Sequence, residues 1–237
     1  MQLPISNNTI ADPLAKVTAR IQQAAEAVGR NRETVRLIAV SKTQPAEAIA
    51  QAYACGQRDF GENYLQEALE KQAALTHLSE IIWHFIGPIQ SNKTRSIAEN
   101  FAWIHSIDRE KVAQRLNDQR PANLVPLQVC VQVNVDDETT KSGVSLAELP
   151  ALAKAVSHLP RLQLRGLMAI PAATNNADQQ RTAFAKLRQA MQSLQAQGYT
   201  LDTLSMGMSG DMEAAIAEGA TMVRIGTDIF GARAKAQ

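Results

Sequence analysis

Lys42 stands directly after a short apolar run, Val35–Ser41, in which aliphatic and β-branched residues predominate. A run of this kind is typical of a strand that is buried on both faces. Where such a strand ends, the ammonium group of a lysine is partly desolvated, and desolvation lowers the pKa of a lysine. More of the amine is then free to form a Schiff base with an aldehyde. The alternative is that the Lys42 side chain simply extends to solvent.

Two segments near the end of the chain combine glycines with hydroxyl side chains, which is the chemistry of an anion site. The first precedes an alanine-rich helical stretch, and the second follows the apolar run Met222–Ile225. Backbone N–H groups, hydroxyls and the N-terminus of a helix all favour a phosphate. Taken singly, such residues are ordinary turn residues or helix caps. Taken together, we interpret them as a phosphate cradle made of Met206, Gly207, Ser209, Gly226 and Thr227.

Arg224 and Asn63 are candidates to bind the same ligand. Arg224 precedes the second segment, and because a guanidinium can only donate, it suits an unprotonated pyridine nitrogen. The alternative is a structural arginine paired with a carboxylate. Asn63 either reaches inward to the ligand or caps the next helix. An aldehyde, a phosphate and a ring nitrogen together describe pyridoxal 5′-phosphate (PLP).

The cysteines and histidines show no pattern of metal ligands. Cys55 and Cys130 are far apart in the sequence, which suits free thiols in a reducing compartment. His84 alternates with Trp83 and Phe85, so it points either into the centre of the fold or against a helix. We interpret it as a packed, hydrogen-bonded histidine and expect no metal site.

The elements that position these residues alternate between helix and strand. Apolar residues at three- and four-residue spacing predict an opening helix over Thr9–Gly29. Further helices are predicted over Pro45–Cys55, Tyr64–Thr76 and Asn92–Asn100. Eight short runs are predicted to be strands: Val35–Ser41, Asp59–Gly61, Trp83–Ile86, Trp103–Ile107, Leu127–Val135, Leu162–Met168, Thr203–Ser205 and Met222–Ile225.

Eight such units in one chain favour a closed α/β barrel of the TIM type, a (β/α)8 barrel with an extra N-terminal helix. An open, doubly wound sheet is the alternative. The functional residues of such barrels lie at the C-terminal ends of the strands. Lys42 would then follow the first strand and lie across the barrel mouth from a cradle that follows the seventh and eighth strands.

Length and composition fit a single domain over residues 1–237, with residues 1–8 as a mobile tail. The chain is 45% hydrophobic and 20% charged, as is usual for a globular protein. With 24 basic and 23 acidic side chains, it has no net field to attract nucleic acid or an anionic membrane. We find no secretory signal and no run of about 18 apolar residues, so we expect a cytoplasmic protein.

Seven blocks of sequence, in the right order, resemble the pyridoxal phosphate homeostasis proteins, also known as the YggS or PROSC family. The resemblance covers roughly Thr9–Ala232. It implies a barrel similar to the N-terminal domain of alanine racemase, with Lys42 as the Schiff-base lysine and the two late loops around the phosphate. The blocks are Ala39–Thr43, Phe60–Tyr64, Trp83–Gly87, Gln90–Lys93, Lys141–Gly143, Met206–Ser209 and Val223–Thr227.

The resemblance implies a part in vitamin B6 homeostasis, in which the protein buffers or supplies PLP without a catalytic activity. Apoenzymes that depend on PLP are then candidate recipients. Two other functions stay open, an amino-acid racemase that uses PLP and a sugar-phosphate enzyme that uses a lysine Schiff base. A racemase of this type needs a further domain with a tyrosine base, whereas this sequence ends at Gln237. Without that domain we expect a monomer.

Three further positions bear on the ligand site. Gln44 stands where many family members have a second lysine, which puts a secondary cofactor site in doubt. Lys141 is a second candidate for a lysine at the barrel mouth. Asp228 stands where a small residue is usual, and it would weaken the field of the phosphate site if it pointed inward.

Overall fold

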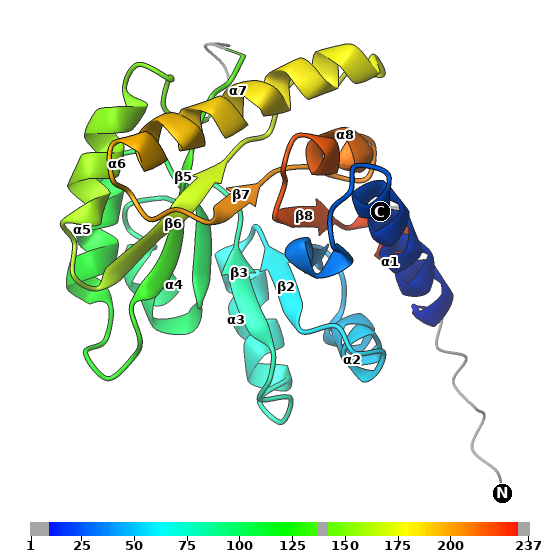
Figure 1. Cartoon of the computed structure of the whole chain (residues 1–237). Coiled ribbons are helices and arrows are strands. Elements are labelled where there is room, and N and C mark those ends of the chain that lie inside the picture. The colour runs from blue at the N-terminus through cyan, green and yellow to red at the C-terminus, as the bar shows by residue number, and fades with distance from the viewer. Residues whose placement is uncertain (1–9, 137–141, 232–237) are drawn as a thin grey trace, which may run out of the picture.

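The structure is a computed structural model in which residues 10–136 and 142–231 are described. The predicted mobile tail, residues 1–8, and the candidate Lys141 lie outside these ranges. Within them, strands β1 to β8 form a closed barrel, and each strand runs parallel to its neighbours. The predicted TIM-type barrel with an extra N-terminal helix is confirmed, and the open sheet is excluded (Figure 1).

The strands are short and agree closely with the predicted runs. The largest difference is at β5, which ends at Gln132 and not at Val135; Val133 still donates to the carbonyl of Met168 and forms an isolated bridge with Val144. The strands are β1 (Arg36–Val40), β2 (Asp59–Glu62), β3 (Ile82–Phe85), β4 (Trp103–Ile107), β5 (Leu127–Gln132), β6 (Leu162–Met168), β7 (Thr203–Ser205) and β8 (Met222–Ile225).

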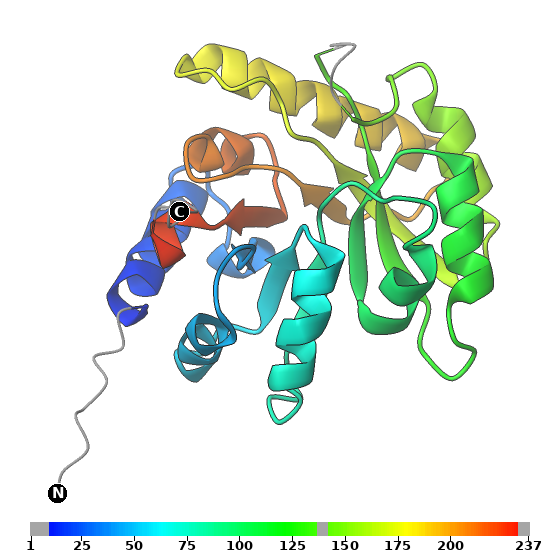
Figure 2. The ribbon, with the colours of Figure 1, turned by 180° about the vertical axis from the view of Figure 1, so that it is seen from behind.

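The helices lie around the outside of the strands, as the view from behind also shows (Figure 2). They are α1 (Ala11–Glu26), the short 3-10 turn η1 (Arg32–Thr34), α2 (Ala46–Ala54), α3 (Leu65–Ala74), α4 (Thr94–Asn100), α5 (Glu110–Gln119), α6 (Leu149–Ser157), α7 (Ala177–Ala196), α8 (Met212–Ala217) and α9 (Thr227–Phe230). α1 packs against α8 and α9, the helices that come before and after the last strand. The predicted end of the opening helix, Gly29, has a φ of 69°, which glycine allows just beyond a helix.

Side chains of the strands alternate between the inside of the barrel and the surrounding helices. A separate buried cluster, which consists of Ile38, Trp103, Cys130, Met168 and Met222, fills the inside. The larger apolar cluster packs between the strands and the helices. The barrel is therefore a packed core and not a pore, and a ligand has room only at its ends.

No helix in the described ranges is long and apolar enough to cross a membrane. In the same part of the chain, histidine, cysteine, aspartate and glutamate side chains form no group of three that could hold a metal ion.

Candidate functional site

Lys42 lies in the loop just after β1, at the end of the barrel where the strands terminate. Its half-buried side chain lines a small cavity of about 60 Å³ together with Val40, Gly226 and Thr227. β1 and β8 are directly paired. The prediction that Lys42 faces this part of the cradle across the barrel mouth is therefore wrong. Closing the barrel makes the first and last strands neighbours, and Lys42 lies beside the loop that follows β8.

The backbone turns sharply after Lys42. Thr43 has a φ of 62°, a left-handed conformation that is unfavourable for a β-branched residue. Its backbone N–H donates a hydrogen bond of 2.5 Å to Oε1 of Glu67 in α3. Strain of this kind costs on the order of 1–3 kcal/mol and persists only where the surroundings hold it. The turn that presents Lys42 is thus fixed from outside by α3.

A buried group of polar residues supports this turn from the side of the helices. Lys71 in α3 is 5% exposed, and its Nζ donates to the carbonyl of Ser41 at 2.7 Å and to Oε1 of Glu62 at 2.9 Å. It also pairs with Glu67. The Ser41 hydroxyl donates to Glu62 at 2.6 Å, and burial raises the pKa of the Glu62 carboxyl. We refer to Ser41, Glu62, Glu67 and Lys71 as the Lys71 cluster.

Sequence reasoning missed the Lys71 cluster. The only signal for it is the four-residue spacing of Glu67 and Lys71, which usually marks a solvated pair on the surface of a helix. Here α3 turns that pair toward the end of β1, and the pair becomes the support of the Lys42 turn.

The two late segments form loops at the same end of the barrel as Lys42, one between β7 and α8 and the other between β8 and α9. Across the described ranges, the backbone N–H groups of Ser209 and Thr227 donate to no protein acceptor. Gly207 has a φ of 97°, and a Cβ atom there would lie 2.6 Å from the Cβ of Ala215, so α8 packs directly against its loop. Unused N–H donors on two neighbouring loops suit an anion.

Arg20 in α1 ties the two loops together, although no pattern in the sequence marks it as a site residue. Its guanidinium donates to the carbonyl of Ser209 at 3.2 Å, to Glu213 at 2.8 Å and to Asp228 at 2.6 Å. The Asp228 carboxylate is therefore held by α1. Its charge is offset by Arg20, so the expected weakening of the phosphate field by an inward-pointing Asp228 does not arise.

Arg224 is 4% exposed and stands inside the barrel near the end of β8. Its guanidinium donates to Oγ of Ser205 at 2.7 Å and to the carbonyl of Ala169 at 3.0 Å. Among the residues that the structure describes it forms no ion pair, so the alternative of an arginine paired with a carboxylate is not supported. Burial lowers the pKa of Arg224 to about 10, which leaves it protonated at neutral pH. These contacts use two of its five N–H groups, and other donors remain for a ligand.

Asn63 and Met206 occupy different environments. Asn63 is not the cap of α3, because Tyr64 holds the cap position and makes no side-chain capping bond. The Oδ1 atom of Asn63 is buried and has no hydrogen-bond partner among the described residues. Met206 is fully buried in the core, and its backbone N–H donates to the carbonyl of Met222. The Asn63 side chain therefore has a polar atom available for a ligand, whereas the Met206 side chain contributes to the apolar core.

His84 points into the barrel, where it bonds to Asp59 and to a second buried histidine, His105. The interpretation of His84 as a packed, hydrogen-bonded residue is confirmed. Nothing in the sequence indicated that His105 would meet it, because the two residues come from different strands.

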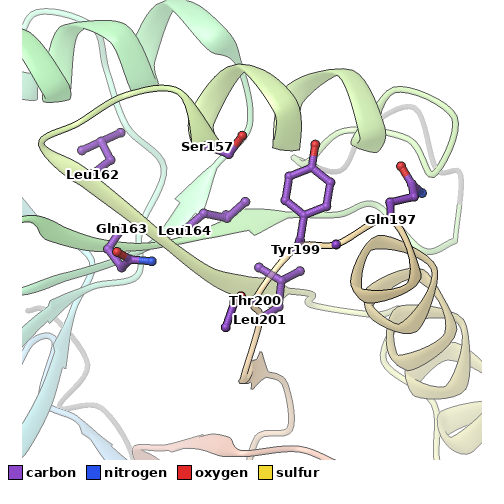
Figure 3. A pocket seen from close by; sticks show the side chains of 9 residues that line it. Ser157, Leu162, Gln163, Leu164, Gln197, Tyr199, Thr200 and Leu201 are labelled. Carbon is purple, nitrogen blue, oxygen red and sulfur yellow. The ribbon is translucent and has the colours of Figure 1, made fainter.

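A larger groove, of about 500 Å³, lies at the opposite end of the barrel (Figure 3). It is lined by residues at the start of β6 and before β7, among them Gln163, Tyr199 and Thr200. No charged side chain lines it, so it offers no cation to an anionic ligand. The chemistry of the described residues is concentrated at the other end, around Lys42 and the cradle.

The barrel and its site define a class of protein whose members carry an alanine racemase N-terminal domain, the family that residues 13–234 match. The chain is 63% identical over 226 residues to the pyridoxal phosphate homeostasis protein of Pseudomonas aeruginosa. The aligned region covers 95% of this chain and 96% of that protein. The homologue of the same name from Escherichia coli K12 is 55% identical over 231 residues, with 95% and 97% covered. The chain belongs to the family of the pyridoxal phosphate homeostasis proteins.

Two solved structures share the fold of this chain, one at high and one at low sequence identity. PipY of Synechococcus elongatus PCC7942, described with PLP bound, is 41% identical and superposes with a TM-score of 0.82, covering 94% of this chain and 100% of PipY. Alanine racemase of Corynebacterium glutamicum is 19% identical with a TM-score of 0.68, and 96% of this chain matches 63% of that enzyme. The racemase shares the fold alone.

Proposed function

We propose that this chain, as a single domain over residues 1–237, binds PLP and serves PLP homeostasis rather than a catalytic cycle. The observation that carries the proposal is the position of Lys42 beside the Gly226–Thr227 loop, in one cavity. The names of the relatives and the PLP bound to PipY support it.

The residues present fit this cofactor. Among the described residues, no acceptor takes the N–H groups of Ser209 and Thr227, which can therefore serve the phosphate; without a Cβ, Gly207 and Gly226 let their loops pack against Ala215 and Val40. Arg224 has remaining donors for the ring nitrogen, and the buried Oδ1 of Asn63 lacks a partner among the described residues. Met206 packs behind the cradle. When PLP is bound, its aldehyde supplies the carbon to which the Lys42 amine forms a C=N bond, with release of one water.

The proposal of a carrier rather than a racemase rests on the tyrosines. Two-base racemisation needs a second group on the opposite face of the substrate. Tyr53 bonds to Glu80, and Tyr199 lines the groove at the far end of the barrel. Tyr64 follows β2 on the side of Lys42, but its side chain is 51% exposed. A racemase assay with alanine should show negligible turnover, and sustained turnover, lost in Tyr64→Phe, would establish the alternative.

Reduction with borohydride tests the proposal directly. The purified protein is mixed with PLP, its absorbance is recorded, and the reduced protein is digested and mapped by mass spectrometry. After unbound PLP is removed, we expect a yellow protein and an adduct on the Lys42 peptide, whereas a sugar-phosphate enzyme should be colourless. Lys42→Ala should lose the adduct, and Lys93→Ala, which removes an exposed lysine at the start of α4, should keep it. If Lys42→Ala retains an equal adduct, the assignment is wrong, and Lys141 is tested next.

We further infer that the protein acts in the cytoplasm as a monomer and hands PLP to apoenzymes that require it. Light scattering of the protein as it elutes from a size-exclusion column measures whether it is a monomer. The transfer of PLP is measured by mixing the loaded protein with an apoenzyme and following the return of the activity of that enzyme. Recovery faster than the release of PLP into buffer supports direct transfer, and recovery at the release rate refutes it.

A further inference from the structure

A chain of hydrogen bonds crosses the inside of the barrel. Oδ1 of Asp59 lies 2.9 Å from Nε2 of His84, and Nδ1 of His84 lies 2.9 Å from Nε2 of His105. Nδ1 of His105 lies 2.6 Å from Oγ of Ser205, which accepts from Arg224 at 2.7 Å. Asp59 begins β2 and Arg224 lies near the end of β8. The chain therefore joins the N-terminal end of the barrel to the candidate site, and we refer to it as the barrel relay.

Burial favours the neutral form of both imidazoles of the barrel relay. It lowers the pKa of His84, an effect that Asp59 opposes, and it lowers the pKa of His105 well below its ordinary value. Trp103 stacks on His84 with the ring centroids 5.7 Å apart and an angle of 16° between the planes, which holds the His84 ring in place. Neither imidazole can rotate away from its partners without opening the packed core.

With both imidazoles neutral, the two ends of the barrel relay fix the direction of every hydrogen bond. A guanidinium can only donate and a carboxylate can only accept. His84 must therefore carry its proton on Nε2, toward Asp59, and its Nδ1 accepts from the Nε2–H of His105. Nδ1 of His105 in turn accepts from the hydroxyl of Ser205. Each donor then has one acceptor, and hydrogen bonds chained in this way strengthen one another.

We propose that the barrel relay positions Arg224 for the ring nitrogen of PLP, with His84, His105 and Ser205 as positioning residues. This inference rests on the proposed function. The relay directs the hydrogen of the Ser205 hydroxyl to His105, so that a lone pair of the same oxygen faces Arg224. Without His105, that hydrogen is free to turn toward the guanidinium, where it would oppose an N–H group.

One test needs no cofactor. The chain has four histidines, of which His77 and His158 are exposed, so the buried rings can be distinguished in long-range ¹H–¹⁵N NMR spectra. We expect His84 and His105 as neutral tautomers with the proton on Nε2 between about pH 7 and about pH 8. A charged ring or a proton on Nδ1 of either residue overturns the proposal.

A pair of serine variants tests the effect on the ligand. Ser205 and Ser106 are both buried, but Ser106 donates to the carbonyl of Gly87, outside the barrel relay, at 2.6 Å. Ser205→Ala should raise the dissociation constant of PLP about tenfold, roughly the worth of one buried hydrogen bond, and shift the absorbance maximum of the bound cofactor. Ser106→Ala should change the constant less than about twofold and leave the maximum in place. Equal effects of the two variants overturn the proposal.

Two substitutions of His105 separate its two nitrogen atoms. His105→Asn provides an acceptor near the position of Nδ1 and can keep Ser205 oriented. His105→Gln reaches the position of Nε2, toward His84, and leaves Ser205 without its acceptor. We expect the absorbance maximum of the wild type in His105→Asn and a shifted maximum in His105→Gln. If the two variants behave alike, the proposal is wrong.

The outcomes separate this inference from the proposed function. If the wild-type protein does not bind PLP, the proposed function fails and the role of Arg224 fails with it. If the wild type binds PLP and the serine and histidine variants match it, only the role of the barrel relay is refuted.

Discussion

Lys71→Met removes one ammonium group from behind the Lys42 turn and nearly preserves the length and volume of the side chain. It leaves the carboxylate of Glu62, whose side chain is 0% exposed, without its cation. It also leaves the carbonyl of Ser41 without a donor. Glu67 is 30% exposed on its side chain and can be hydrated, so its share of the loss is small.

The expected cost follows from these contacts. Breaking a buried ion pair by removing one partner costs about 3–5 kcal/mol, because a charge stays buried without compensation. We expect Lys71→Met to lower the free energy of unfolding by about 3 kcal/mol at neutral pH, the lower end of the range, because the Glu62 carboxyl can take up a proton. The double variant Lys71→Met with Glu62→Gln removes both charges, and it should recover to within about 1 kcal/mol of the wild type.

The pH dependence of this loss has a defined sign. Burial already raises the pKa of Glu62 above its ordinary value of 4.5, and losing Lys71 removes an attraction that lowers it. Between pH 4.5 and the raised pKa, the folded variant holds a proton that the unfolded chain releases. Folded-state stability therefore decreases as the pH rises through that window. The deficit of Lys71→Met should be smaller at about pH 5.5 than at about pH 8.

Urea unfolding followed by circular dichroism at the two pH values measures the loss. Lys154→Met, which changes an exposed lysine in α6, is the matched control and should stay within about 0.5 kcal/mol of the wild type. If Lys71→Met behaves like this control at both pH values, the Lys71 cluster does not support the Lys42 turn.

Three smaller perturbations address the loops and the thiols. Gly207→Ala should lower the free energy of unfolding in urea by about 3 kcal/mol, because the new residue has to adopt a left-handed backbone and its Cβ clashes with Ala215. Gly56→Ala has the same φ of 97° but open space around it, and it should lower this free energy by about 1–2 kcal/mol. Equal losses in the two variants would show that the packing of α8 against Gly207 does not matter. Arg20→Ala should lower stability by about 1 kcal/mol and speed the release of PLP, with both effects reduced at high salt, and release at the wild-type rate argues against a role for Arg20. Burial raises the pKa of Cys130 to about 12, so a thiol reagent should modify the exposed Cys55 in the folded protein and Cys130 only after unfolding; reaction of both in the folded state excludes this.

The sequence predicts the fold well because each strand is marked by its own local pattern. Eight apolar runs between helical stretches leave few arrangements other than a closed barrel. The same pattern places Lys42 and the late loops at one end, since the C-terminal ends of parallel strands point the same way. Local patterns therefore determine which end of the barrel carries the site.

The contacts that complete the site are not local and could not be predicted in this way. Lys71 looks like a surface residue of a helix, and only its contacts with Ser41 after β1 and with Glu62 of β2 show it to be buried. Arg20 meets Ser209 and Asp228 only because α1 packs against α8 and α9. Periodicity indicates which face of an element is buried, but it does not indicate which distant side chains meet there.

The pairing of β1 with β8 has a further consequence for the kinetics of the fold. This pair closes the barrel and joins the most distant parts of the sequence, so it carries a large loop-closure entropy. A ligand attached to Lys42 on one side and to Thr227 on the other spans that seam. Its binding free energy is available only while the seam is closed, so an occupied barrel must release its ligand, or break the bond to it, before the first and last strands can separate.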